Sequence, residues 1–155
     1  MISRQALPDL SLRAVIAGNI DDVRALAPHA AQQDFIASNA ESLALAAAHP
    51  HMHARTIYAG EVLAGFALYA EPGPAGRQDT YVLYRLMLAA GWQGQGLGRR
   101  ALELLLGEMR ARGAARVALY YAPANLIARQ LYASAGFVET GIDADGEMMA
   151  VRTPA

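Results

Sequence analysis

A glycine-rich loop between an apolar run and an amphipathic run constrains the fold of this chain more than any other feature. Gly94, Gly96 and Gly98 stand at alternate positions between the apolar run 81–90 and the amphipathic run 97–112. These patterns predict a buried strand that turns into a helix. Glycine lets a ligand approach the backbone closely, and the free N–H groups that open a helix attract anions. The segment therefore predicts a binding site for a diphosphate.

Two common nucleotide-binding motifs do not fit this loop. A Walker A loop needs Gly-Lys-Ser/Thr, and the chain contains no lysine. A dinucleotide fingerprint needs G-x-G-x-x-G and an acidic residue about 20 positions on. Here the glycines run G-x-G-x-G, and the next apolar run, 115–121, ends without a carboxylate. The pattern Gln-x-x-Gly-x-Gly from Gln93 to Gly98 resembles the acetyl-CoA loop of the GNAT superfamily of N-acetyltransferases. The alternative is a glycine-rich connection that binds no ligand.

Length and composition exclude several other classes. A chain of 155 residues fits one domain, which we expect to span residues 1–155. Without cysteine the chain has no disulfide and no thiolate metal site. No apolar run approaches the ~20 residues of a membrane span or resembles a signal peptide, so we expect a soluble, cytoplasmic protein that binds no membrane. The formal net charge of −1 argues against a nucleic-acid partner.

Hydrophobic periodicity predicts strands and helices along the whole chain. We expect strands at 10–16, 55–59, 62–70, 80–89, 115–121, 137–140 and 147–152, and helices at 21–27, 31–48, 95–112 and 125–135. This order predicts an α/β (α+β) fold with a mixed central sheet of about six to seven strands flanked by about four helices. It also resembles the GNAT fold, whose central sheet is splayed, from end to end.

A second group of residues lies beyond the glycine loop. Asn125 is a good helix N-cap, and Gly136 stands where a left-handed C-cap is wanted. Asn125, Arg129 and Tyr132 follow each other at offsets of four and three, which puts them on one helical face. In GNAT proteins the matching Asn and Tyr face the cofactor. The alternative for Tyr132 is a tyrosine that only packs.

The resemblance implies an acetyl-CoA-dependent N-acetyltransferase that uses no metal. The cofactor-binding residues that it implies are Met87, Leu88, Gln93, Gly94, Gln95, Gly96, Leu97, Gly98, Arg99, Asn125, Arg129 and Tyr132. In the catalytic step, the backbone N–H of Leu88 would polarise the thioester carbonyl. Tyr132, with an ordinary pKa of about 10, would protonate the departing thiolate.

Three segments narrow the resemblance to bacterial diamine, spermidine and spermine N-acetyltransferases. They are residues 34–42, 85–87 and 145–147. This likeness implies a polyamine acceptor, which needs acidic partners along its length. The substrate-binding residues that we expect are Glu41, Tyr84 and Glu147.

Several questions stay open at this level. The candidates for the group that accepts the proton of the amine are Glu41, Glu71, Asp79, Glu147 and Tyr84. The acceptor could instead be an antibiotic, an amino acid or a protein N-terminus, and a CoA-binding sensor without transfer activity is a further alternative. A homodimer is possible through an exposed strand edge near the C-terminus.

Two polar features remain outside these motifs. Residues 49–53 contain three histidines, but the proline among them prevents a helical pair and no carboxylate lies close by in the sequence. We therefore expect a polar loop there. Arg85 is the one charge inside the apolar strand 80–89, and it needs a partner if that strand is central.

Overall fold

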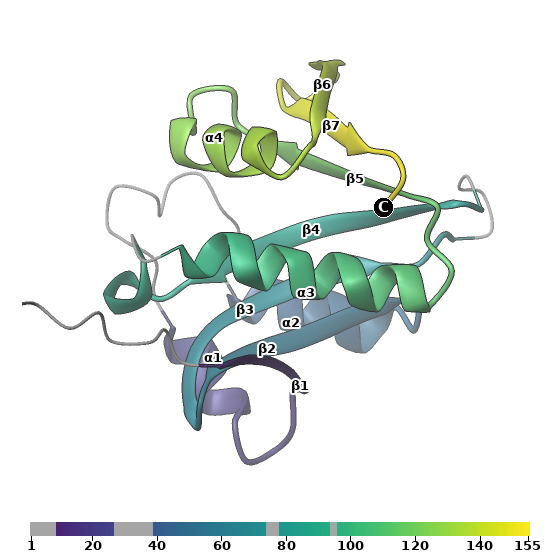
Figure 1. Cartoon of the computed structure of the whole chain (residues 1–155). Coiled ribbons are helices and arrows are strands. Elements are labelled where there is room, and N and C mark those ends of the chain that lie inside the picture. Colours follow the sequence, from purple (N-terminus) through teal and green to yellow (C-terminus); the bar gives the residue numbers. More distant parts are fainter. Residues whose placement is uncertain (1–8, 27–38, 74–77, 94–95) are drawn as a thin grey trace, which may run out of the picture.

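The computed structural model describes residues 9–26, 39–73, 78–93 and 96–155. Within these ranges it contains a seven-stranded sheet in the order β1-β2-β3-β4-β5-β7-β6, four α-helices and one short 3-10 helix (Figure 1). The strands are β1 (Leu10–Ala14), β2 (Met52–Ala59), β3 (Val62–Ala70), β4 (Thr80–Leu88), β5 (Arg116–Tyr121), β6 (Val138–Ile142) and β7 (Met148–Arg152). The helices are α1 (Ile20–Ala25), α2 (Asn39–Ala48), η2 (Ala90–Trp92), α3 (Leu97–Ala111) and α4 (Leu126–Ser134). The predicted fold class and element order are confirmed.

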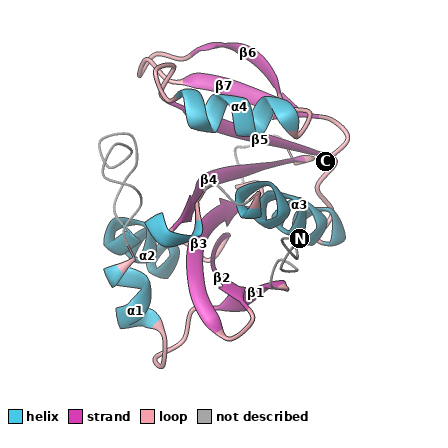
Figure 2. Ribbon diagram, turned by 60° about the vertical axis from the view of Figure 1, so that its left-hand side comes forward, coloured by secondary structure: helices cyan, strands magenta, loops and turns pink. Residues whose placement is uncertain are grey.

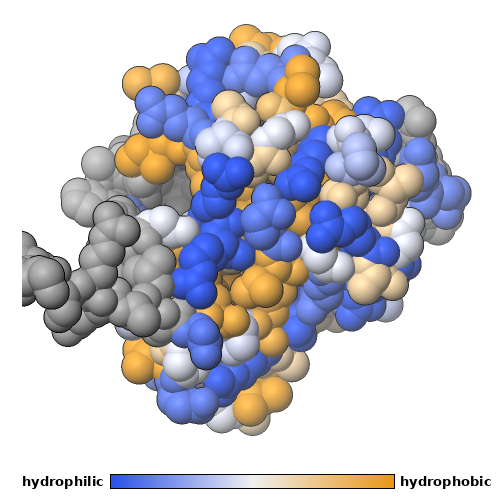
Figure 3. Space-filling model, in the orientation of Figure 1, coloured by the Kyte–Doolittle hydropathy of each residue, from blue (hydrophilic) through white to orange (hydrophobic). Residues whose placement is uncertain are grey.

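Helices cover both faces of the sheet. Helix α3 lies on one face, and α1 and α2 lie on the other (Figure 2). Six residues of α3 are buried at helical spacing against the sheet, namely Leu97, Ala101, Leu102, Leu105, Leu106 and Met109. Hydrophilic side chains gather on the solvent side over α3 (Figure 3). No helix in the described ranges combines the length and the apolar character needed to cross a bilayer.

The sheet splits between β4 and β5. These two strands pair in parallel only from Thr80 to Leu83, opposite Arg116 to Leu119, although β4 continues to Leu88. A β-bulge lies where the pairing ends, because Leu68 of β3 pairs with Arg85 while Tyr69 pairs with Leu83. Tyr84 is thus the extra residue of the bulge. A bulge bends its strand and increases the local twist, so β4 turns away from β5.

Some predicted boundaries are corrected. Strand β2 begins at Met52 rather than at residue 55, because Met52 and His53 pair with Ala70 and Tyr69 of β3. The expected polar loop at 49–53 is therefore partly strand. Of the helix predicted at 31–48, the described part is α2, and residues 31–38 lie outside the described residues.

Arg85 finds its partner on α2. Its Nε and Nη2 both donate hydrogen bonds to Asn39 Oδ1, at 2.9 and 2.8 Å. Asn39 Nδ2 in turn donates to the Val23 carbonyl at 2.7 Å. Burial lowers the pKa of Arg85 to about 10, partly offset by the charge of Glu41, so the guanidinium is charged at neutral pH. This contact fastens α1 and α2 to the middle of the sheet.

We predict that Asn39→Leu lowers the free energy of unfolding by about 2–4 kcal/mol, because it leaves a buried charge without its acceptor. In an Arg85→Met background the same substitution should cost about 1–3 kcal/mol less. Urea unfolding of the four proteins measures both values. Additive effects would mean that Asn39 acts through Val23 and not through Arg85.

Candidate active site

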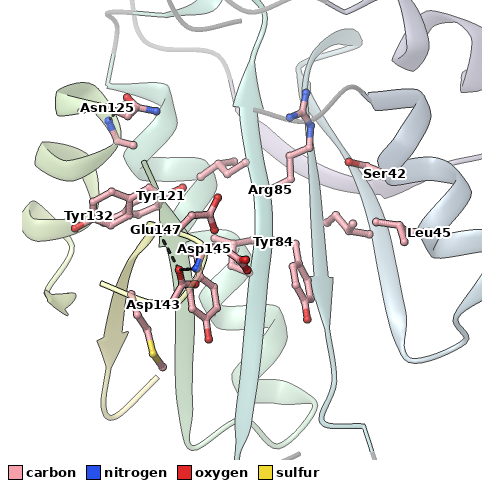
Figure 4. Close-up of a pocket in the computed structure, with 16 residues that line it drawn as sticks. Ser42, Leu45, Tyr84, Arg85, Tyr121, Asn125, Tyr132, Asp143, Asp145 and Glu147 are labelled. Atoms are coloured by element: carbon pink, nitrogen blue, oxygen red, sulfur yellow. Dashed lines mark hydrogen bonds between the residues drawn. The ribbon is translucent and has the colours of Figure 1, made fainter. Parts of the chain in front are cut away.

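A cleft of about 630 Å³ lies at the split between β4 and β5. Its walls come from α2, from the middle of β4, from the end of β5, from α4 and from the turn between β6 and β7 (Figure 4). The polar and aromatic side chains that line it are Ser42, Tyr84, Arg85, Tyr120, Tyr121, Asn125, Tyr132, Asp143, Asp145 and Glu147. The split therefore brings together residues that are more than 100 positions apart in the sequence.

The backbone of Leu88 faces the split. Leu88 pairs with Gly65 of β3, and the next N–H, that of Ala89, donates to the Ala64 carbonyl at 2.9 Å. In an antiparallel ladder this makes Leu88 and Gly65 a non-hydrogen-bonded pair. Leu88 thus directs its own N–H and C=O away from β3, toward the edge that β5 has left. The carbonyl accepts a hydrogen bond from Gln93 Nε2 at 2.9 Å.

Helix α3 opens next to this strand end. Gly96 is its N-cap in the left-handed conformation, with φ of 76°, which a side chain would strain. Leu97 is buried, Gly98 is half-buried and Arg99 is exposed. The predicted residues Gly94 and Gln95 lie outside the described residues. The first-turn N–H groups of α3 are available to an anion, as in other helices.

Met87 is the other predicted residue on β4. Its side chain packs on the face of the sheet that α1 and α2 cover. It belongs to the cluster of buried residues beneath α1 and α2, together with Phe66 and Leu68. Met87 is not among the residues that line the cleft.

Helix α4 supplies one wall of the cleft. Asn125 is its N-cap, and its side chain accepts a hydrogen bond from the Ala128 N–H at 3.2 Å. Tyr132 is buried between the rings of Tyr121 and Phe137, whose centroids lie 5.7 and 5.8 Å away. Burial raises the pKa of Tyr132 to about 12. The phenol is therefore protonated throughout the physiological range.

Arg129 differs from its two neighbours on this helix. It is half-exposed, it is not among the residues that line the cleft, and its Nε and Nη2 donate to the carboxylate of Glu139 on β6 at 2.6 and 3.0 Å. Glu139 also accepts a hydrogen bond from the Tyr121 hydroxyl at 2.6 Å. Sequence spacing gave no sign of this pairing, because Glu139 lies beyond the helix.

The turn between β6 and β7 brings carboxylates to the cleft. The Asp143 carboxylate accepts the N–H groups of Asp145 and Glu147, both at 2.9 Å, and so fixes the turn. Asp145 and Glu147 are exposed, and neither carboxylate has a partner among the residues that the structure describes. The sequence pointed to Glu147 but missed Asp145 and Ser42. The repeated acids of the Asp-Ala-Asp-Gly-Glu turn were the available signal.

The remaining predicted acids lie elsewhere. Glu41 is exposed on α2 and is not among the residues that line the cleft, although Ser42 beside it is. Glu71 accepts a hydrogen bond from the Tyr81 hydroxyl at 3.1 Å and lies 2.7 Å from His53 Nε2, which lowers the pKa of the carboxyl. Of the five proton-acceptor candidates, the cleft contains Tyr84 and Glu147.

The histidine segment thus has a carboxylate beside it in space, although none lies close by in the sequence. His53 and Glu71 form a pair, but the described residues include no group of three or more potential ligands that could hold a metal ion.

Comparisons with known proteins place these features in context. The sequence model of the acetyltransferase (GNAT) family matches residues 20–137. The mycothiol acetyltransferase of Beutenbergia cavernae is 42% identical over 65 residues, which are 42% of this chain and 22% of that protein. The chain thus spans about a fifth of the length of this curated relative.

Solved structures resemble the whole fold. An acetyltransferase from Thermus thermophilus matches with a TM-score of 0.79 and 20% identity, over 96% of this chain and 99% of that one. An aminoglycoside acetyltransferase in complex with coenzyme A and kanamycin matches with a TM-score of 0.78 and 18% identity, over 94% and 95%. At these identities the match is one of fold.

We predict that Asn125→Ala lowers the free energy of unfolding by about 1 kcal/mol, because it removes the cap of α4. Asn125→Ser, which keeps a capping oxygen, should stay within a few tenths of a kcal/mol of the wild type. Urea unfolding measures the difference. Equal stability of the alanine and serine variants would show that the bond to Ala128 contributes nothing.

Proposed function

The chain belongs to the acetyltransferase (GNAT) family, whose sequence model matches residues 20–137, and from this premise we propose that it transfers the acetyl group of acetyl-CoA to a primary amine of a small molecule. Diamines and polyamines such as spermidine and spermine are the first acceptors that we propose. The observation that carries the proposal is the cleft at the split, which combines a free strand edge, a buried tyrosine and two carboxylates that have no partner among the described residues.

The proposed reaction is a direct attack in a ternary complex. The amine nitrogen forms a bond to the acetyl carbonyl carbon, the bond from that carbon to sulfur breaks, and the proton lost by the amine balances the one gained by the departing thiolate. The products are the N-acetylated amine and the free thiol of CoA. Acetyl-CoA supplies the activated acyl group, and the chain supplies binding, orientation and proton positions.

The described residues fit such a cosubstrate. The N–H of Leu88 points to the edge that β5 has left, where it can donate to the thioester carbonyl oxygen and stabilise the charge that develops there. Apart from its two chain neighbours, no described residue lies within 4 Å of the position that a Cβ of Gly96 would take, which leaves space for a diphosphate at the start of α3. We propose that Gln93 supports this arrangement through its bond to the Leu88 carbonyl.

Tyr132 is proposed as the group that meets the departing sulfur. With its pKa raised to about 12, it is a weaker acid than an ordinary tyrosine. Full proton transfer to a thiolate of pKa about 8.5 would be uphill by about 5 kcal/mol. The buried phenol therefore acts mainly as a fixed hydrogen-bond donor to the developing negative charge.

Asp145 and Glu147 are proposed to attract the amine. A cationic acceptor is favoured by two carboxylates without partners of their own among the described residues, since a ligand that neutralises them gains Coulomb energy. Glu147 or Tyr84 can then receive the proton of the attacking amine, directly or through water.

Turnover with a panel of amines tests the proposal. Release of CoA thiol from acetyl-CoA should rise on addition of putrescine, cadaverine, spermidine or spermine, with kanamycin and a peptide N-terminus as the competing acceptors. Acetyl-CoA binding without thiol release for any amine would overturn the transferase function and favour a CoA-binding sensor. Thiol release with kanamycin or the peptide alone would exclude the diamines and polyamines as acceptors.

We predict that Tyr132→Phe lowers kcat by about 10²-fold or more and leaves the affinity for acetyl-CoA nearly unchanged, because only the hydroxyl is lost. Since the raised pKa of about 12 keeps the phenol protonated, the ratio of wild-type to variant kcat should be constant from neutral pH to about pH 10. Steady-state kinetics at several pH values measure this ratio. A ratio that falls toward one in this range would mean that Tyr132 ionises there and has another role.

A further inference from the structure

Arg85 brings a positive charge with an unused donor to the cleft. Arg85 as a whole residue is 7% exposed, and it lines the cleft. A guanidinium carries five N–H donors, and Asn39 Oδ1 takes those of Nε and one of Nη2. Nη1 is buried and has no hydrogen-bond partner among the described residues. Leaving such a donor unsatisfied is costly unless an acceptor from a ligand or a water joins it.

The partner that Arg85 does have is neutral. Asn39 satisfies two of its nitrogens but cancels none of its charge, which the charge of Glu41 on α2 offsets in part. Ser42 lies on α2 and is 3% exposed. Figure 4 shows its hydroxyl on the side of the cleft where Arg85 lies. A guanidinium N–H and a hydroxyl together are suited to an oxygen anion.

The two walls of the cleft therefore carry opposite charges. Asp145 and Glu147 come from the turn between β6 and β7, whereas Arg85 and Ser42 come from β4 and α2 (Figure 4). A ligand made only of ammonium groups satisfies the first wall and is repelled by the second. A ligand that bears both signs satisfies both.

We propose that the acceptor is an amine that also carries a carboxylate, of the class of the basic amino acids, with its carboxylate on Arg85 Nη1 and Ser42 Oγ. This inference rests on the proposed transferase function and narrows its acceptor from diamines in general to diamino acids. The reacting nitrogen loses its proton and gains the acetyl group as described above, so the product is an N-acetylated amino acid together with CoA thiol. The carboxylate takes no part in the bond changes and fixes the orientation of the substrate.

Matched pairs of substrates test the inference. Lysine and cadaverine have the same chain of carbons between two amines and differ by the carboxylate, and ornithine and putrescine form a second pair. Lysine should exceed cadaverine in kcat/KM by about tenfold or more, as a charge-assisted hydrogen bond in a buried site provides. Lysinamide, which keeps both amines and a carbonyl oxygen but no negative charge, should fall between them.

Variants assign the preference to Arg85. Arg85→Met should bring the ratio of lysine to cadaverine to about one, and Arg85→Lys should restore part of it, because a charge alone suffices for some attraction. Ser42→Ala should reduce the ratio by a smaller factor. Arg24→Met serves as the control, since Arg24 lies on the surface of α1 in an ion pair with Asp21. The ratio of lysine to cadaverine in this variant should equal that of the wild type.

The outcomes separate this inference from the function on which it rests. Equal turnover of lysine and cadaverine by the wild type, or a preference for cadaverine, overturns the carboxylate site and leaves the transferase intact. An unchanged ratio in Arg85→Met also overturns it. Acetyl-CoA binding with no turnover of either amine overturns the transferase function itself. If Arg85→Met does not fold, the wild-type ratios of lysine to lysinamide and to cadaverine decide.

Discussion

The early end of the pairing between β4 and β5 is the constraint on which the rest of the molecule depends. Four residues of β4 pair with β5, and the bulge at Tyr84 then turns the strand away. A sheet that paired along its whole length would have no cleft and no free backbone at Leu88. Because unpaired main-chain groups are costly unless a partner or water satisfies them, such a gap persists where a ligand makes use of it.

The fold could be predicted from the sequence because its signals are local. Strand β4, the glycine loop and α3 follow from apolar runs and punctuation within about thirty residues. The caps at Asn125 and Gly136 are equally local, and the structure has both, with φ of 89° at Gly136. The start of β2 was missed because Met52 and His53 are held by pairing with Ala70 and Tyr69, which their own sequence does not encode.

The position of a candidate site residue was predictable only where its own element sets that position. Asn125 and Tyr132 line the cleft because the helix face puts them there, and the backbone of Leu88 faces the split because it ends β4. The pairing of Arg129 with Glu139, and the approach of Asp145 to Ser42 across the cleft, depend on where separate elements dock. Contacts between separate elements have no fixed spacing in the sequence, so no sequence pattern predicts them.

Arg85 shows how one residue can serve packing and recognition together. Its bonds to Asn39 fasten α2 to the sheet, and a carboxylate at position 39 would do this as well or better, since it would pair with the charge. An ion pair would also neutralise the guanidinium and fill more of its donors. The amide leaves the charge intact and Nη1 without a partner among the described residues, so the neutral partner keeps the cleft bipolar. Asparagine at position 39 thus stabilises the fold less than a carboxylate would, and it leaves Arg85 able to bind an anion.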